Sequence, residues 1–192
     1  MLQTVTSFIR QKLDQHLVNS FSLEESIAVL NHLALHDGSA PPKNRNKMVI
    51  TVINLDYDTN KPFFGGQQRA GDNRIIRFNP GYTFNVDLLF TASFDDYEES
   101  LKFLNGTIEY FQSNICVTRS SAPDLPRGVH SLRFDILNST LSETHNLWSA
   151  IGAKYQPSVI YKVRHITVQQ ERINVISPPV LNVNRSTAGN LE

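Results

Sequence analysis

The chain has 192 residues, a length that fits one compact domain or one domain followed by an extended segment. Its 18 basic and 18 acidic side chains cancel, which argues against partners that recruit a protein by net charge, such as nucleic acid or an anionic membrane. The single cysteine excludes an intrachain disulfide. The sequence shows no signal peptide and no run approaching the ~20 apolar residues of a membrane span, so we expect cytoplasmic synthesis and assembly.

The first 18 residues predict an amphipathic helix, because apolar side chains recur three or four positions apart. These side chains are Val5, Phe8, Ile9, Leu13 and Leu17. Residues 22–36 carry two conflicting signals. Ser22 and Glu25 have the spacing of a helix-capping box, whereas the apolar residues from Ile27 to Leu35 alternate as in a strand. The alternation favours a strand.

Residues 48–57 are apolar at nearly every position, which is typical of a strand buried on both faces. Residues 58–81 then form a long polar loop, and loops of this length inside compact domains are usually functional. The loop mixes basic and aromatic side chains, a combination found both in protein interfaces and in sites for single-stranded nucleic acid. The balanced net charge favours protein contact. The candidate interface residues are Phe63, Phe64, Arg69, Arg74 and Arg77.

Residues 84–90 alternate as a half-buried strand, and the helix that follows has the clearest periodicity in the chain. Its apolar stripe, which we expect to be the buried face, comprises Tyr97, Leu101, Leu104, Ile108, Phe111 and Ile115. Ser93 and Asp96 have the spacing of a capping box at its start. Gly106 lies off this stripe and is expected at the surface, with a close backbone approach by a neighbour as the alternative. Cys116 is expected to be buried near the helix end.

Residues 132–168 predict a strand, a short helix and a second strand. Leu132, Phe134 and Ile136 alternate with charged residues, and Thr140 and Glu143 have the spacing of a capping box. Gly152 ends the short helix, Pro157 prevents its continuation, and residues 158–168 predict the final strand. The predicted order is α-β-β-β-α-β-α-β. It describes an α+β fold in which a single mixed β-sheet is flanked by helices.

The composition changes near residue 171, where a proline pair, Pro178-Pro179, interrupts the apolar residues and the end becomes polar. We therefore predict a domain over residues 1–170 and an extended C-terminal arm over 171–192. The arm adds six candidate interface residues: Ile173, Val175, Ile176, Val180, Leu181 and Val183. Extended arms commonly bind partners by adding a strand to a sheet.

Side chains capable of catalysis or metal binding form no recognisable pattern. His32 and His36 have a spacing that suits two ligands on one helical turn, but no third ligand completes a set. Gly65-Gly66 lacks the strand-to-helix context of a phosphate-binding loop. The acidic residues at 95–99 fit the ordinary charge preference of a helix N-terminus. We predict no catalytic residue, no cofactor and no metal, and hence a structural protein.

Three blocks resemble one protein family. They are NKMVITVINL at 46–55, FDDYEESLKFL at 94–104 with Tyr110-Phe111-Gln112, and LWSAIGAKYQPSVIYKVR at 147–164. Together they resemble the tail-terminator, or cap, proteins of extracellular contractile injection systems of the antifeeding-prophage type. The likeness spans roughly residues 1–170 and leaves out the arm.

This resemblance implies a phage tail-terminator-like fold and a ring, expected to be a homohexamer, at the end of the tail distal to the baseplate. The implied partners are other copies of the chain, a sheath protein and an inner-tube protein, with no nucleic acid and no membrane insertion. The particle is either released from the cell or kept inside. The family motif residues have folding roles: Trp148 and Tyr155 brace the short helix, and Pro157 sets the start of the last strand. The full motif set is Tyr97, Leu101, Leu104, Trp148, Gly152, Tyr155, Pro157 and Tyr161.

Three alternatives remain open from the sequence. The first is a terminator or completion protein of a true phage tail or of an intracellular secretion apparatus. The second is a nucleic-acid-binding module that uses the basic loop. The third is a metal-dependent hydrolase built on His32 and His36.

Overall fold

The computed structural model describes residues 1–58, 67–69, 75–77, 82–168 and 174–176. Within these residues, six strands form one mixed sheet in the order β1-β2-β5-β8-β7-β6. They are β1 (Ala28–Leu30), β2 (Lys47–Tyr57), β5 (Tyr82–Ser93), β6 (Cys116–Thr118), β7 (Ser131–Leu137) and β8 (Ser158–Val168). β1 runs parallel to β2, and the other neighbours are antiparallel.

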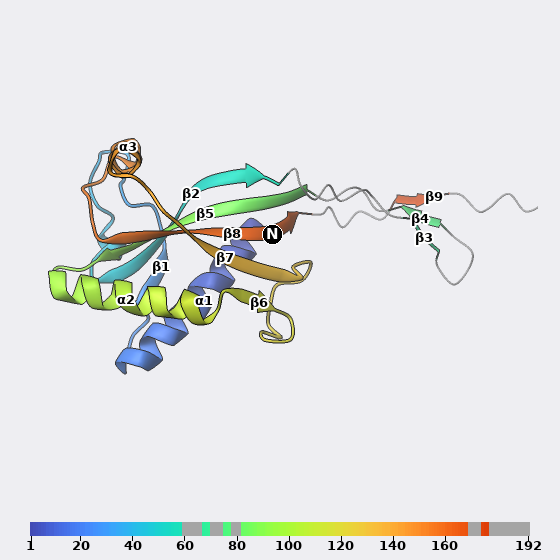
Figure 1. Ribbon diagram of the computed structural model, residues 1–192, viewed down its shortest axis with the longest axis horizontal. Helices are drawn as coiled ribbons and strands as arrows, with labels where there is room; N and C mark the ends of the chain where they lie inside the picture. The colour runs from blue at the N-terminus through green and yellow to red at the C-terminus, as the bar shows by residue number, and fades with distance from the viewer. Residues whose placement is uncertain (59–66, 70–74, 78–81, 169–173, 177–192) are drawn as a thin grey trace, which may run out of the picture.

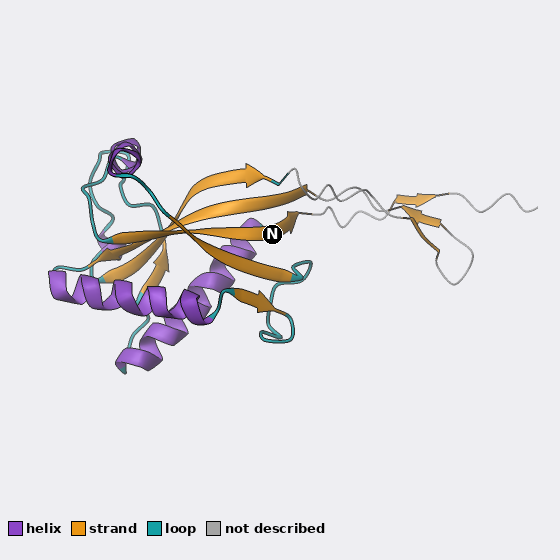
Figure 2. Ribbon diagram, viewed as in Figure 1, coloured by secondary structure: helices purple, strands orange, loops and turns teal. Residues whose placement is uncertain are grey.

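Helices lie on both faces of this sheet (Figures 1 and 2). The helices are α1 (Leu2–Phe21), α2 (Tyr97–Ser113) and α3 (Leu141–Ile151), with a short 3-10 turn at Pro42–Asn44. α1 and α2 cover the main core, whereas α3 covers a smaller cluster on the opposite face. The eight predicted elements occur in the predicted order, and the α+β class with a mixed sheet is confirmed. The prediction missed β6 and a second, small sheet described below.

The first helix is confirmed, and all five of its predicted apolar residues are buried. The capping-box interpretation at Ser22 is wrong, because Ser22 ends α1 with φ at 51°, in the left-handed region. The strand prediction for 22–36 is confirmed only over Ala28–Leu30. Asp14 of α1 holds the start of this strand, since its Oδ1 accepts hydrogen bonds from the backbone N–H groups of Ile27 (2.7 Å) and Ala28 (2.8 Å).

The prediction that 48–57 is buried on both faces holds only for the first half of β2. Met48, Val49 and Ile50 are buried, but Val52 is 42% exposed and Leu55 is 47% exposed. β1 pairs with β2 only over Met48–Ile50, so the second half of β2 lies at the outer edge of the sheet. The apolar run of β2 therefore contains two parts, a first half in the core and a second half at an exposed edge of the sheet.

The predicted buried face of the second helix is wrong. Of its six stripe residues only Phe111 is buried; Leu104 and Ile108 are half-buried, and Tyr97, Leu101 and Ile115 are exposed. The buried residues of α2 are Ser100, Phe103, Gly106, Thr107, Tyr110 and Phe111. Both the sheet and α1 pack against α2, so the buried sector is turned toward the angle between them. The cap at the start of α2 is Asp96 alone, whose side chain accepts from the backbone N–H groups of Glu98 and Glu99.

Gly106 is buried where α1 crosses α2, so its expected surface position is also wrong. A Cβ atom at this position would lie 3.0 Å from Leu17 Cδ2 and 3.0 Å from Phe21 Cε2. A neighbouring helix does approach Gly106 closely, but through side chains, so the alternative of a close backbone approach is also not what the structure shows. Cys116 is exposed, contrary to expectation, because it begins β6 at the edge of the sheet.

The C-terminal part of the sheet agrees closely with the sequence analysis. β7 buries Leu132 and Phe134 but leaves Ile136 54% exposed. The capping box of Thr140 and Glu143 is present at α3, and Gly152 ends that helix in the left-handed conformation. β8 begins at Ser158 and ends at Val168, as predicted. None of the described helices is long and apolar enough to cross a bilayer.

Candidate assembly surfaces

The predicted interface loop and the predicted arm meet in the second sheet. Its strands are β3 (Gln67–Arg69) and β4 (Ile75–Arg77) from the loop and β9 (Asn174–Ile176) from the arm, in the order β3-β4-β9. β9 is antiparallel to β4, with Val175 opposite Ile76. Figure 1 shows this small sheet away from the helices, beyond the ends of β5 and β8. Two segments that the sequence analysis treated as separate candidates thus belong to one unit.

Four of the eleven predicted interface residues lie in this small sheet: Arg69 in β3, Arg77 in β4, and Val175 and Ile176 in β9. The other seven lie outside the described residues: Phe63, Phe64, Arg74, Ile173, Val180, Leu181 and Val183. Nothing in the sequence indicated that β4 and β9 pair, because strands of three residues carry almost no periodic signal.

A second surface is the polar part of the sheet face that carries α3. One row of directly opposed residues crosses four strands: Asn54, Asp87, Lys162 and Asp135. Lys162 Nζ lies 2.8 Å from Asp56 Oδ2 and 3.5 Å from Asp87 Oδ1. Asn54 Nδ2 donates to Asp87 Oδ2 at 3.1 Å. Opposite charges thus alternate across the strands, an arrangement that stabilises cross-strand pairs.

A separate ion-pair cluster surrounds Asp135 at the β7 side of the sheet. Arg133 Nε lies 3.1 Å from Asp135 Oδ1, and Arg164 Nε donates to Asp135 Oδ2. Together with the cluster of Lys162, Asp56 and Asp87, three acidic and three basic side chains lie on this face in two clusters. They are Asp56, Asp87, Asp135, Arg133, Lys162 and Arg164. The formal charges of these two clusters, together called the polar network, cancel.

The hydrogen bonds of the network shift the pKa values of its members. The hydrogen bond from Lys162 lowers the pKa of Asp56, and the same contact raises the pKa of Lys162. Burial alone would raise the pKa of Asp135, but the hydrogen bonds from Arg164 and Arg133 outweigh burial and lower it. These directions keep every one of the three groups charged at neutral pH. The network therefore holds fixed charges and fits a structural surface.

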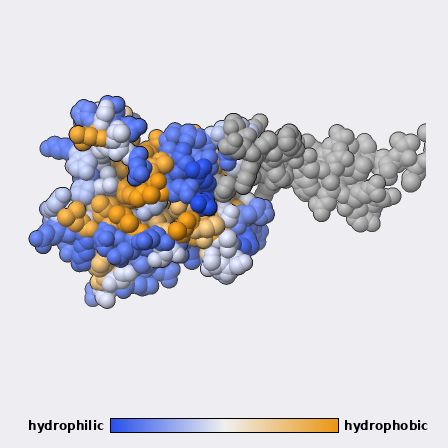
Figure 3. Space-filling model, in the orientation of Figure 1, coloured by the Kyte–Doolittle hydropathy of each residue, from blue (hydrophilic) through white to orange (hydrophobic). Residues whose placement is uncertain are grey.

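A third surface is apolar and consists of the residues along α2 and just after it that were predicted to be buried but are exposed or half-buried. We call Tyr97, Leu101, Leu104, Ile108 and Ile115 the outer stripe. Its C-terminal end adjoins β7, because Ile115 O accepts from Phe134 N at 2.9 Å and the rings of Phe111 and Phe134 lie 4.9 Å apart. Figure 3 shows hydrophobic surface on the side of the molecule where Figure 1 places α2 and β7.

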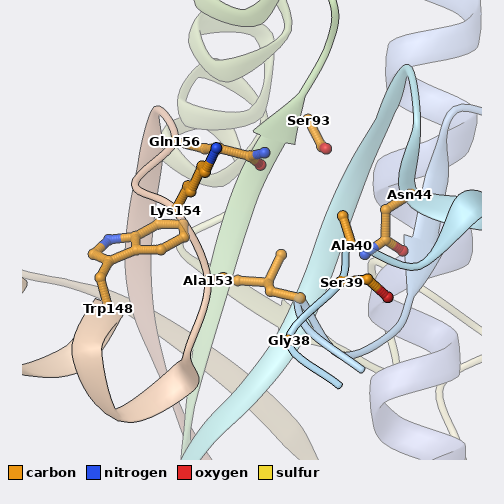
Figure 4. Close-up of a pocket in the computed structure, with 10 residues that line it drawn as sticks. Gly38, Ser39, Ala40, Asn44, Ser93, Trp148, Ala153, Lys154 and Gln156 are labelled. Carbon is orange, nitrogen blue, oxygen red and sulfur yellow. The ribbon is translucent and has the colours of Figure 1, made fainter. Parts of the chain in front are cut away.

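A cavity of about 350 Å³ lies between the segment before β2, the end of β5 and the turn that joins α3 to β8 (Figure 4). Trp148 forms one wall, and Ser39 and Asn44 lie across from it. The amide of Asn44 is already used, donating to His32 O at 2.9 Å and accepting from Asn31 Nδ2 at 2.8 Å. The lining contains one charged side chain, Lys154, and no carboxylate. This lining has no pair suited to general acid–base catalysis.

The family motif residues occupy different environments. Trp148 packs with Leu33, Val49 and Leu89 between α3 and the sheet, and its ring lies 5.5 Å from that of Tyr155. Tyr155 is itself 67% exposed. Tyr161 is buried against Phe111, with ring centroids 4.4 Å apart, and burial raises its pKa. The bracing role assigned to Trp148 and Tyr155 and the role of Pro157 stay predictions.

Histidines 32 and 36 are not brought into a metal site. Both are exposed and lie in an irregular segment, so the helical geometry that their spacing required is absent there. Across the part of the chain that the structure describes, no group of three His, Cys, Asp or Glu side chains is placed to hold a metal ion.

The described residues thus present a partly open edge on β2, an outer stripe of apolar residues along α2 and a small outlying sheet. The sequence model of the Pvc16 N-terminal domain matches residues 4–182, so the chain belongs to this family. The resemblance stated from the three sequence blocks is thereby confirmed at the level of the family. No curated protein sequence matches the chain.

The fold of the chain is shared by solved structures, among them two that are similar to it over nearly its whole length. One is the sheath/tube terminator of PVC, an extracellular contractile injection system, in its extended state: the identity is 13% and the TM-score 0.60, over 95% of this chain and 63% of that one. The other is the tube-terminating cap of the anti-feeding prophage: the identity is 11% and the TM-score 0.62, over 100% of this chain and 62% of that one. The chain therefore spans less than two thirds of the length of either structure.

Proposed function

We propose that this chain is the terminating cap domain of a contractile, phage-tail-like injection system, with a structural role and no catalysis. Copies form a ring, a homohexamer by the family resemblance, at the end of the tail distal to the baseplate. The observation that carries the proposal is the likeness of nearly the whole chain to two proteins that are both described as terminators. Membership of the Pvc16 N-terminal domain family supports it further.

A ring can stop a growing tail by geometry alone. The tip of a helical tail offers the same subunit surface at every stage of growth. A ring that binds this surface and presents a different outer face leaves nothing for the next subunit to bind. Head-to-tail contacts that close on themselves also limit the ring to one size. The partners in this proposal are the inner-tube protein, the sheath protein and other copies of this chain.

The small sheet is suited to bind a ring of sheath subunits next to the cap. Its strands β4 and β9 join the basic loop to the arm, so both would move toward a partner together. β9 pairs on one edge with β4, and no described strand pairs with its other edge. A strand from a sheath subunit could add there through backbone hydrogen bonds. The cap would be made in the cytoplasm and leave the cell only as part of a particle.

Electron microscopy of particles tests the capping role. Particles from cells that lack this chain should show tubes of uncontrolled length or sheaths that shorten prematurely. The same cells supplied with the intact chain are the control. Particles of normal length with extended sheaths in the absence of the chain would refute the capping role.

The role of the arm is tested by deletion. A chain without residues 171–192 should fold, because the described core of the main sheet is built from residues between Val5 and Ile166, yet it should no longer retain sheath. A matched control without residues 184–192 keeps β9 and all six predicted contact residues of the arm, and should retain sheath. Equal sheath binding by both truncated chains would show that the arm is not the sheath contact.

A further inference from the structure

Two strands of the main sheet each have an outer edge that no other described strand covers. On β2, the pairing with β1 covers only Met48–Ile50. On β7, the pairing with β6 covers only Ser131–Arg133, and the last bond runs from Phe134 N to Ile115 O at 2.9 Å. Open edges invite pairing with another chain unless they are blocked. The edges lie on opposite sides of the sheet, one near each end of its strand order.

The backbone groups that point outward belong to residues with exposed apolar side chains. The backbone O of Ile50 faces away from β5, because it accepts a hydrogen bond from Asn31 N. Backbone groups of alternate residues in a strand face the same side, so those of Val52 also face the outer edge. The irregularity between Val52 and Asn54 shifts this alternation, and Leu55 is the next outward residue. On β7 the outward Phe134 N–H makes Ile136 the next outward residue. Val52, Leu55 and Ile136 are each about half exposed.

These side chains all project from the same face of the sheet. Val52 lies opposite Leu88, Leu55 opposite Val86, and Ile136 opposite Tyr161. Leu88, Val86 and Tyr161 all belong to the core under α1 and α2, and directly opposed residues share a face. The apolar side chains at both edges are therefore on the side of the sheet that carries these two helices.

Strand direction allows the two edges to meet. Each of β2, β5, β8 and β7 is antiparallel to the next, so β7 runs opposite to β2. A second copy that continues the sheet in the same orientation would place its β2 antiparallel to β7, with the apolar side chains of both on one face. We propose that β2 of one copy pairs with β7 of the next, and that this contact closes the ring. The inference rests on the proposed function, which requires a ring, and names the contact that forms it.

The polar row on the other face specifies the register. Asn54, Asp87, Lys162 and Asp135 lie directly opposite one another in turn. Continuing this row across the contact puts Asn54 of the neighbouring copy beside Asp135, so that a polar side chain meets a charged one. The same register, with the irregularity that β2 already shows against β5, puts Val52 of the neighbouring copy opposite Ile136. In both of these pairs the partners match in polarity.

The outer stripe of α2 supplies contact area. A stable interface buries about 800 Å² on each partner, more than a few paired residues provide. Ile115 sits beside the open part of β7, and Leu101 lies on the same flank of α2; both are about half exposed. Because the two edges differ, the contact is head-to-tail and can close into a ring without a free end.

Two single variants test the contact by the mass of the assembly in solution. Val52→Lys blocks the β2 edge, and Ile136→Lys blocks the β7 edge. Each should weaken association about a hundredfold or more and leave monomers, because it places an unpaired charge in the contact. An equimolar mixture should form dimers but no rings, since one variant keeps an intact β7 and the other an intact β2. Leu141→Lys changes a side chain that is 88% exposed on α3 and should leave the ring unchanged.

Light scattering after size-exclusion chromatography measures the masses, and thermal unfolding shows that each variant is folded. Rings formed by either single variant would overturn the edge contact. The capping role would then still be tested separately by electron microscopy of the particles. A single variant that forms dimers by itself would also overturn it, because its contact would pair identical edges. An intact chain that forms no assembly overturns both this contact and the ring of the proposed function.

Discussion

Asp14 offers a sharp test of how α1 is joined to the sheet. Its Oδ1 accepts three hydrogen bonds: from Ile27 N at 2.7 Å, from Ala28 N at 2.8 Å and from Ser26 Oγ at 3.0 Å. The substitution Asp14→Ala removes the only acceptor of these bonds in one step. It leaves two backbone N–H groups without this partner where the chain enters β1, and Ala28 is buried there.

The expected loss is about 3 kcal/mol in the free energy of unfolding. Hydrogen bonds to a charged group contribute roughly 1.5–3 kcal/mol each, but they share one acceptor and do not add fully. The Ser26 hydroxyl is exposed and can bond to water, so the two backbone bonds carry most of the effect. In a domain of this size, 1 kcal/mol corresponds to a shift of about 2–4 °C, so Tm should fall by roughly 6–12 °C.

Urea unfolding of three variants measures this effect. Asp14→Asn keeps an acceptor oxygen and should lose about half as much as Asp14→Ala. The control Asp37→Ala removes a carboxylate that accepts from Ser39 N at 2.9 Å in an exposed turn, and it should change the midpoint far less. If Asp14→Ala lowers the midpoint no more than Asp37→Ala, the link from Asp14 to β1 is not an important source of stability.

Two further predictions concern α2 and the polar network. Gly106→Val should lower the free energy of unfolding by about 2–3 kcal/mol, because its side chain must displace Leu17 and Phe21, which lie 3.0 Å from the position of a Cβ atom; Gly106→Ala should cost less because alanine regains about 1 kcal/mol of helix propensity. Urea midpoints compare both with the parent chain, and an unchanged midpoint for valine would contradict the tight crossing. For the network, Asp56 and Asp135 have pKa values below the ordinary 3.8, so the stability that they contribute is present above about pH 4 and is lost as the pH falls through the lower folded values. Lys162 has a pKa above the ordinary 10.5, so its contribution is present below that pH and is lost as the pH rises through the raised value. The stability difference between the parent chain and Lys162→Met should therefore be largest near neutral pH and shrink at both extremes; a difference independent of pH would argue against the ion pairs.

Much of the fold could be predicted because its signals are local. The capping box of Thr140 and Glu143, the left-handed Gly152 and the strand from Ser158 each depend on residues within a few positions of one another. The block around Trp148 likewise carried enough information to indicate the family, which the match over residues 4–182 confirms. These features hold in any environment that leaves the local backbone free to adopt its preferred conformation.

The candidate surfaces were harder to predict. The loop and the arm were each chosen by composition, yet their pairing through Ile76 and Val175 joins positions 99 residues apart. The outer stripe was assigned to the core because it is the most regular apolar pattern in α2. In the structure its exposed end lies beside β7, and the smaller residues Ser100, Gly106 and Thr107 are buried instead.

The sequence alone determined the order of the eight main helices and strands and the ends of α3 and β8, since caps, prolines and periodicity act through neighbouring residues. Only the tertiary structure decided which side of each element is covered. Gly106 is buried because α1 crosses α2 at that point, and Val52 is exposed because β1 stops pairing with β2 at Ile50. Burial depends on which distant segments arrive against a surface, and a periodic pattern shows that a face is apolar without showing what packs on it.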